Sequence, residues 1–171
     1  MRSIPAATFL VGALLFVVNV VPQVTLADEA LTPQAFATAA IGANSFELQS
    51  AKLAQQRSLS KDTKDFATDM IRDHTHAGDM LAKAASNQGI NVPAELDPEN
   101  QRKLNALKIV AAGDFDQAYL STQVTAHEDV LKLFQTYSKS GPDGPLRNAA
   151  NAIMPTLKMH NVRVHLLASP G

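Results

Sequence analysis

The sequence contains no cysteine among its 171 residues. This absence excludes disulfides, thiolate metal ligands, c-type haem attachment and cysteine nucleophiles. The sequence also lacks a large net charge: 15 basic side chains are offset by 16 acidic ones, which leaves −1. No basic patch favours nucleic acid as a partner. No Ser-His-Asp arrangement and no phosphate-binding glycine loop can be read from the residues either, so common classes of hydrolase and nucleotide-binding protein are disfavoured.

Strand patterns are missing as well, since no segment alternates apolar and polar residues with β-branched enrichment. Apolar residues instead recur at spacings of three and four, which is typical of amphipathic helices. The sequence therefore predicts long helices over about 33–57, 61–88, 115–139 and 146–167, and a short helix over about 100–112.

Helix boundaries in the sequence predict how these helices connect. Thr32 and Ser60 are suitable N-caps, Gly89 is a suitable C-terminal stop, and Asp114 is expected to cap the third long helix. The connection over 58–62 is short, which favours an antiparallel pair. The connection between the second and third long helices is long. We therefore predict an all-α, ferritin-like four-helix bundle with a long crossover that carries the short helix.

The first 27 residues have the pattern of a secretory signal peptide. Arg2 is the only charge before Asp28, an apolar run covers 6–21, and Ala27 ends a small-residue cleavage site. The alternative is an uncleaved anchor, but the run is short of the roughly 20 residues that a span requires. We expect a signal peptide over 1–27 and a single domain over 28–171. The protein is then exported to the periplasm, where it stays or associates with the outer membrane, with no transmembrane span after cleavage.

Each long helix carries a titratable residue in or beside its apolar face. On the second helix, the segment 66–81 places Asp73 near the centre of the face and His74 at its edge. Glu47 lies in the stripe of the first helix, His127 on the flank of the third, and His160 inside the stripe of the fourth. His76 and His165 are expected at the surface, and Tyr119 and Tyr137 are expected to turn their hydroxyls to solvent or a partner.

Several short segments resemble one family of exported bacterial proteins. The segments are Asn44-Ser45-Phe46-Glu47-Leu48, Phe66-Ala67, Met70-Ile71-Arg72-Asp73-His74, Phe115-Asp116-Gln117-Ala118-Tyr119-Leu120, His127, Met154-Pro155 and His160. They are similar in order and spacing to the family known as domain of unknown function 4142, whose members are often labelled outer membrane proteins and regarded as ferritin-like. The resemblance covers about 32–168. It implies a ferritin-like fold and export, and it brings no established activity.

The titratable residues fit a mononuclear metal site better than a di-iron site. Di-iron proteins of this fold use single glutamates on two helices and Glu-x-x-His pairs on the other two. Asp73-x-x-His76 fits such a pair, but position 157 is Leu where a second acid would be needed, so ferroxidase chemistry is disfavoured. A mononuclear site of Glu47, His74, His127 and His160, with Asp73 as a ligand or as a partner that orients one, suits a divalent transition metal such as Zn, Cu, Fe or Ni.

Two other interpretations of these residues stay open. They can form a structural polar network, with the acids paired to Arg72 or to the histidines, or they can form an acid–base site. The favoured function is non-enzymatic binding or protection of the cell envelope under stress. The alternatives are an oxidoreductase with a reduced metal centre and an interaction module that uses 90–112 or an exposed helix face. A homo-oligomer or an envelope protein partner is compatible with each of these functions.

Overall fold

A computed structural model describes residues 31–93 and 96–169, and over these residues the chain is helical with no strand. The elements are α1 (Pro33–Arg57), α2 (Lys61–Ser86), α3 (Pro98–Ile109), the 3₁₀ turn η1 (Ala112–Asp114), α4 (Phe115–Ser140) and α5 (Pro145–Ala168). The all-α prediction is confirmed. Among the described helices, none combines the length and the apolar character that crossing a bilayer demands. The predicted signal peptide over 1–27 lies outside the described residues.

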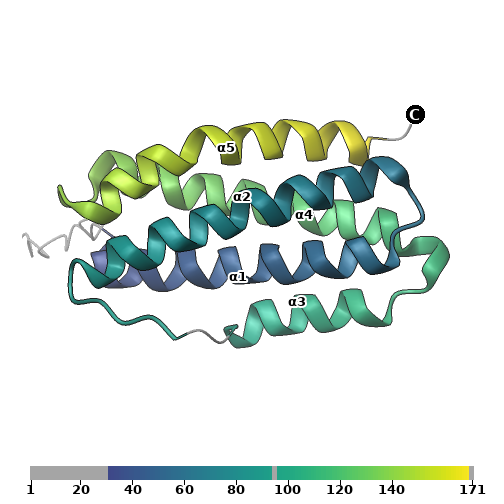
Figure 1. The fold of residues 1–171 in the computed structure, drawn as a ribbon, viewed down its shortest axis with the longest axis horizontal. Helices are drawn as coiled ribbons and strands as arrows, with labels where there is room; N and C mark the ends of the chain where they lie inside the picture. Colours follow the sequence, from purple (N-terminus) through teal and green to yellow (C-terminus); the bar gives the residue numbers. More distant parts are fainter. Residues whose placement is uncertain (1–30, 94–95, 170–171) are drawn as a thin grey trace, which may run out of the picture.

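The four long helices pack as a bundle in the cyclic order α1, α2, α5, α4, because α1 and α5 each pack against both α2 and α4. Figure 1 shows α1 and α5 running in one direction and α2 and α4 in the other. The crossover after α2 returns the chain along α1 through α3 before α4 begins. The predicted four-helix bundle, with its short helix in the long crossover, is therefore confirmed.

Local side chains explain most helix ends. Thr32 accepts a hydrogen bond from the Ala35 amide (3.2 Å) and Ser60 accepts one from the Thr63 amide (3.3 Å), so both predicted N-caps are confirmed. Gly89, with φ of 67°, follows α2, which ends at Ser86. The predicted cap at Asp114 is wrong. This residue lies in η1 with φ −101° and ψ −5° and makes no capping hydrogen bond, because an N-cap needs extended backbone.

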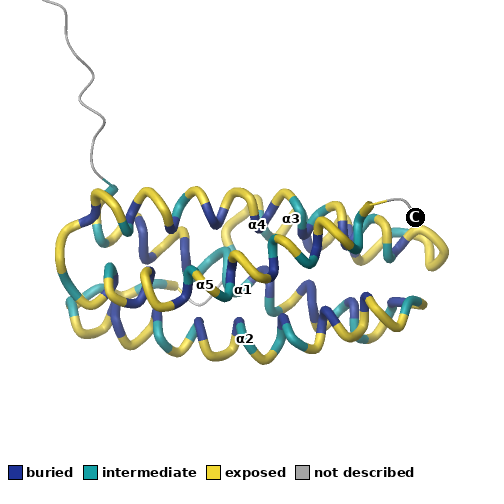
Figure 2. The backbone as a smooth tube through the Cα atoms, turned by 90° about the horizontal axis from the view of Figure 1, so that it is seen from above, coloured by how far each residue is buried: buried dark blue, intermediate teal, exposed yellow. Residues whose placement is uncertain are grey.

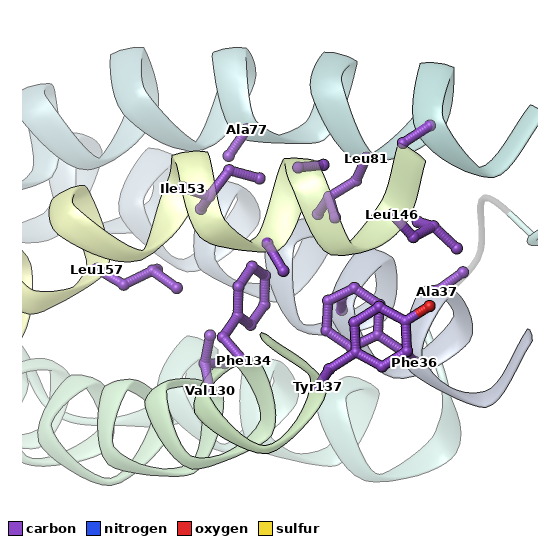
Figure 3. Close-up of a cluster of buried hydrophobic side chains, with 14 of the residues drawn as sticks. Phe36, Ala37, Ala77, Leu81, Val130, Phe134, Tyr137, Leu146, Ile153 and Leu157 are labelled. Carbon is purple, nitrogen blue, oxygen red and sulfur yellow. The ribbon is translucent and has the colours of Figure 1, made fainter. Parts of the chain in front are cut away.

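The core consists of two hydrophobic clusters, one in each half of the bundle. Figure 2 shows buried residues along the inward sides of the long helices. In the first cluster, Phe36 stacks on Tyr137 with ring centroids 3.9 Å apart and meets the edge of Phe134 (Figure 3). The second cluster surrounds Phe66 and Tyr119. The prediction for Tyr119 and Tyr137 is wrong: both hydroxyls are buried without a partner in the described chain, because both rings face the bundle axis.

The crossover helix is anchored by the last residue of α1. The Arg57 guanidinium donates to the carbonyl groups of Leu107 (2.7 Å), Lys108 (2.8 Å) and Val110 and lies 4.6 Å from the centroid of the Phe115 ring. These carbonyls lie at and just beyond the end of α3, where the last carbonyls of a helix lack the usual amide four residues on; that of Leu107 also accepts from the Val110 amide at 3.4 Å. A single cationic side chain therefore fixes α3 beside α1 and the start of α4.

Candidate metal centre

A layer of polar side chains separates the two hydrophobic clusters near the middle of the bundle. Glu47 on α1, His74 on α2, His127 on α4 and His160 on α5 each lie near the middle of their helix. Packing these helices side by side brings the four positions to the same height. All four are buried, with exposed fractions of 1, 4, 1 and 4%. One ring nitrogen of each histidine lies within 4.8 Å of the others.

The fifth predicted residue, Asp73, lies at the edge of the centre. The sequence placed Asp73 in the middle of the apolar face and His74 at its edge, and this order is wrong: the Asp73 side chain is 20% exposed and His74 is buried. The buried stripe of α2 continues from Met70 through His74 and Ala77 to Leu81. Neighbouring residues differ by only 100° around a helix. Packing against the neighbouring helices, rather than residue spacing along α2, determines whether Asp73 or His74 faces the interior of the bundle.

Each histidine is held from behind by a hydrogen bond. The three bonds are His74 Nδ1 to Asn44 Oδ1 (2.9 Å), His127 Nδ1 to the Gln123 carbonyl oxygen (3.0 Å) and His160 Nε2 to Asp73 Oδ2 (2.9 Å). All three acceptors are oxygens, so these ring nitrogens carry the protons. The opposite nitrogens, His74 Nε2, His127 Nε2 and His160 Nδ1, have no hydrogen-bond partner in residues 31–93 and 96–169. Their lone pairs are left free in the core.

Two of these orienting partners, Asn44 and Gln123, are not among the site residues that the sequence predicts. Asn44 has room because Gly78 faces it from α2: a Cβ at Gly78 would lie 2.7 Å from the Asn44 amide nitrogen. Gln123 acts through its backbone carbonyl, and its side chain donates to Ser50 (3.0 Å). Every residue has a backbone carbonyl, so the sequence could not have indicated this acceptor. Asn44 could have been found as a short polar residue one turn before Glu47.

Burial controls the protonation of the three imidazoles. It lowers the pKa of His127 to about 4 and that of His74 well below its usual value, where His127 and His160 add to the effect. Burial also lowers the pKa of His160, although Asp73 opposes it. The histidines are therefore neutral near pH 7. Neutral imidazole is the form that binds metal ions, so no proton has to leave the rings before binding.

Glu47 completes the layer as a buried carboxyl group. Neither of its oxygens has a hydrogen-bond partner in the described chain, and Oε1 lies 3.7 Å from His127 Nδ1. Burial raises the pKa of Glu47 to about 8 despite the opposing influence of Gln123 and Lys103. Glu47 is therefore a neutral acid near pH 7. The carboxyl group lies beside His127 Nδ1, the nitrogen that bonds the Gln123 carbonyl, and is not one of the three groups whose ligand atoms lie within 4.8 Å of one another. A cation bound by the imidazoles would favour its ionised form, and the side chain would have to rotate to become a fourth ligand.

Asp73 is held as a carboxylate by two partners. Partial burial raises its pKa, but hydrogen bonds from Arg72 and His160 outweigh this and hold the pKa below its usual value. The Arg72 guanidinium is bidentate, with Nε 2.7 Å from Oδ1 and Nη2 2.9 Å from Oδ2. A carboxylate fixed in this way sets the tautomer of His160 and makes its free nitrogen more basic.

The substitution Asp73→Asn is expected to weaken metal binding at this centre about 10- to 100-fold, which is the usual cost of losing a partner that orients a ligand. The measurement is a Zn²⁺ titration of metal-free protein by calorimetry. Asp69→Asn is the matched control, because Asp69 lies on the same helix as Asp73, bonds Arg72 and, on α5, Arg163, and makes no hydrogen bond to a ring nitrogen of the centre. Equal affinities for Asp73→Asn and the unaltered protein would show that Asp73 does not act on the metal site.

The arrangement is an incomplete polar network. The predicted pairing of Asp73 with Arg72 and a histidine is present, but three ring nitrogens and both Glu47 oxygens lack partners among the described residues. Each such group costs about 1–3 kcal/mol. Nitrogens around a tetrahedral ion lie about 3.3 Å apart, so side-chain rotations that move each ring nitrogen by about 1 Å would bring all three onto one ion.

His76 and His165 are exposed, as predicted. The Asp73-x-x-His76 pair therefore does not reach the centre.

The sequence was compared with known proteins. It matches the family model described as Domain of unknown function (DUF4142) over residues 21–167. No curated protein and no solved structure matches the chain.

Proposed function

The chain belongs to the family described as Domain of unknown function (DUF4142), and we propose that it is a metal-binding protein holding one divalent transition metal ion in the middle of its bundle. The family description carries no activity, so the proposal rests on the centre. One observation supports it most: three imidazoles, one from each of three helices, have free nitrogens, while the opposite nitrogen of each ring is fixed by a hydrogen bond. Metal-bound histidines have this pattern.

The donor set favours some ions over others. Three neutral imidazoles and one carboxyl group suit Zn²⁺, Co²⁺, Cu²⁺, Ni²⁺ or Fe²⁺, and disfavour Mg²⁺ and Ca²⁺, which prefer oxygen ligands. Three imidazoles around one point, with Glu47 as a fourth ligand once its side chain turns inward, favour a tetrahedral ion, of which Zn²⁺ is the commonest.

We propose binding rather than turnover. The cavity beside His74 and Glu47 has a volume of about 10 Å³, enough for one ion or one water and too small for a substrate. The signal pattern over 1–27 supports action after export, in the periplasm or at the outer membrane, where binding a reactive metal ion would protect the envelope under stress. An oxidoreductase with this centre would need a way for substrate to reach the ion.

The protein can also act as an interaction module through α5. Its residues Met159, Val162 and Leu166 are large, apolar and exposed, and they recur at spacings of three and four along the helix. Such a stripe suits a second copy of the chain or an envelope protein. This role is compatible with the metal centre, which lies on the inward side of α5.

A Co²⁺ titration of metal-free protein tests the proposal. We expect one equivalent to bind, with the intense visible absorption of a tetrahedral Co²⁺ ion, and Zn²⁺ to displace it in an equimolar amount. Loaded protein that oxidises no Fe²⁺ beyond one equivalent would support binding, and sustained oxidation would favour the oxidoreductase. If neither Co²⁺ nor Zn²⁺ binds in a stoichiometric amount, the proposed function is wrong.

A further inference from the structure

A groove of about 760 Å³ lies between α1, α3 and α4, beside the crossover. Figure 1 shows α3 next to α1 on the outside of the bundle. The walls are largely apolar and include Ala39, Ala43 and Phe46 of α1 and Val130 and Leu133 of α4. The groove lies at the start of α3, and Arg57 fixes the opposite end of that helix. The groove is far larger than the cavity at the centre.

The floor of the groove is also a wall of the metal centre. Glu47 and Val130 line both the groove and the small inner cavity that contains His74. Glu47 is 1% exposed, and both of its oxygens lack a partner in the described part of the chain. A buried carboxyl group therefore separates the groove from the inner cavity, which of the three imidazoles only His74 lines. Rotation of this one side chain would connect the two spaces.

The charges along the groove favour a cation. Among its lining residues, three carboxylates, those of Asp97, Glu99 and Asp129, accompany a single ammonium group, that of Lys103. Lys103 is itself paired with Glu99 at 2.8 Å. Acidic groups in a cleft with apolar walls focus negative potential and raise the local concentration of cations.

A second groove offers an internal comparison. It has a volume of about 580 Å³, lies between α1, α2 and the start of the crossover, and contacts the same inner cavity through Asn44. None of the residues that line it is charged. Its contact with the centre is an amide already bonded to His74, which is a poorer ligand for a cation than a free carboxyl group. The two grooves thus differ in the features that would attract and transfer a metal ion.

We infer that the groove between α1, α3 and α4 is the route by which a divalent transition metal ion enters the centre, with Glu47 as the ligand that transfers it. The inference rests on the proposed function. The ion collects at the acidic mouth, binds the Glu47 carboxylate from the groove side, and reaches the imidazoles when that side chain turns inward. The proton that Glu47 loses on binding the cation leaves to solvent through the groove.

Filling the groove tests this route. Ala43 lies one turn from Glu47 and lines the groove, so Ala43→Phe would obstruct the path without replacing a ligand. Ala82→Phe in the second groove is the matched control. The readout is the rate at which Co²⁺ alone, mixed with metal-free protein in a stopped-flow instrument, gives the absorption of the loaded centre. We expect Ala43→Phe to slow loading at least about tenfold at unchanged stoichiometry, and Ala82→Phe to load at the normal rate.

Two further variants make the result decisive. Ala39→Phe fills the groove from an exposed position one turn earlier, so it serves if Ala43→Phe folds poorly. Asp129→Asn removes one charge and should slow loading a few-fold at low salt and hardly at all at high salt. Normal loading by both groove-filling variants, or equal slowing by Ala82→Phe, would overturn the route alone. A failure of Co²⁺ to bind the unaltered protein would overturn the proposed function and the route together.

Discussion

The substitution His127→Phe is expected to abolish most metal binding while leaving the bundle folded. Structural zinc sites gain about 10–16 kcal/mol in total, or roughly 2.5–4 kcal/mol for each of four ligands, so the loss of one imidazole should weaken binding by about two orders of magnitude or more. Phenylalanine is a suitable replacement because His127 is buried and packs near Phe66, with ring centroids 6.5 Å apart. It also removes a ring nitrogen that lacks a partner in the described chain. Metal-free His127→Phe should therefore be about as stable as the unaltered protein.

Thermal unfolding with and without Zn²⁺ provides the measurement. At a free concentration 100 times the Kd, an ion that binds only the folded state adds about 2.7 kcal/mol, which for a chain of this length raises the Tm by about 5–10 °C. The His127→Phe variant should gain almost nothing at that concentration. His165→Gln is the control, because His165 is exposed and pairs with Glu128 at 3.1 Å away from the centre. A full Tm increase in His127→Phe would mean that the ion binds elsewhere.

The substitution Glu47→Gln is expected to change how stability depends on pH. The pKa of Glu47 is raised from 4.5 in the unfolded chain to about 8 in the fold by burial. The folded state therefore holds a proton that the unfolded state has lost. The stability that this proton contributes is complete below pH 4.5 and is lost as the pH rises through about 8. A difference of this size corresponds to at most about 5 kcal/mol at high pH. Glutamine has the same shape and does not titrate.

The three buried histidines have the opposite effect on the pH dependence of stability, and this determines the pH interval in which Glu47→Gln should be compared with the unaltered protein. Their folded pKa values lie below 6.5, so their contribution is present above pH 6.5 and is lost as the pH falls. Above pH 6.5 the folded histidines are neutral, and the unfolded ones lose their remaining protons equally in the unaltered protein and in Glu47→Gln, so the difference between the two proteins isolates Glu47. Urea unfolding of the metal-free proteins should show the unaltered protein losing about 2 kcal/mol relative to Glu47→Gln between pH 6.5 and 8. If the two proteins respond identically to pH, Glu47 is not the buried acid described above.

The architecture could be predicted from the sequence because helix spacing, caps and connection lengths all agreed. Thr32 and Ser60 cap helices as predicted, and the long crossover identified the bundle type. The prediction failed where a choice depended on packing between helices. Spacing alone could not decide between Asp73 and His74, and the 3₁₀ turn that holds Asp114 has no distinctive residue pattern.

The prediction of the candidate metal centre was limited in the same way, because it too depends on packing between helices. The sequence placed a titratable residue on each long helix, and the four positions near mid-helix meet in the core. The partners that orient the rings could not be predicted, because Gln123 uses its backbone oxygen and Asn44 depends on the space left by Gly78. The metal-binding role itself stays a prediction.

The placement of one donor on each long helix has a consequence for biosynthesis. Along the chain Glu47, His74, His127 and His160 are separated by intervals of 27, 53 and 33 residues. No helical hairpin holds more than two of them, and a nascent chain holds all four only once His160 has been synthesised. Under the proposed function, the full ligand set is therefore assembled only when the whole bundle folds.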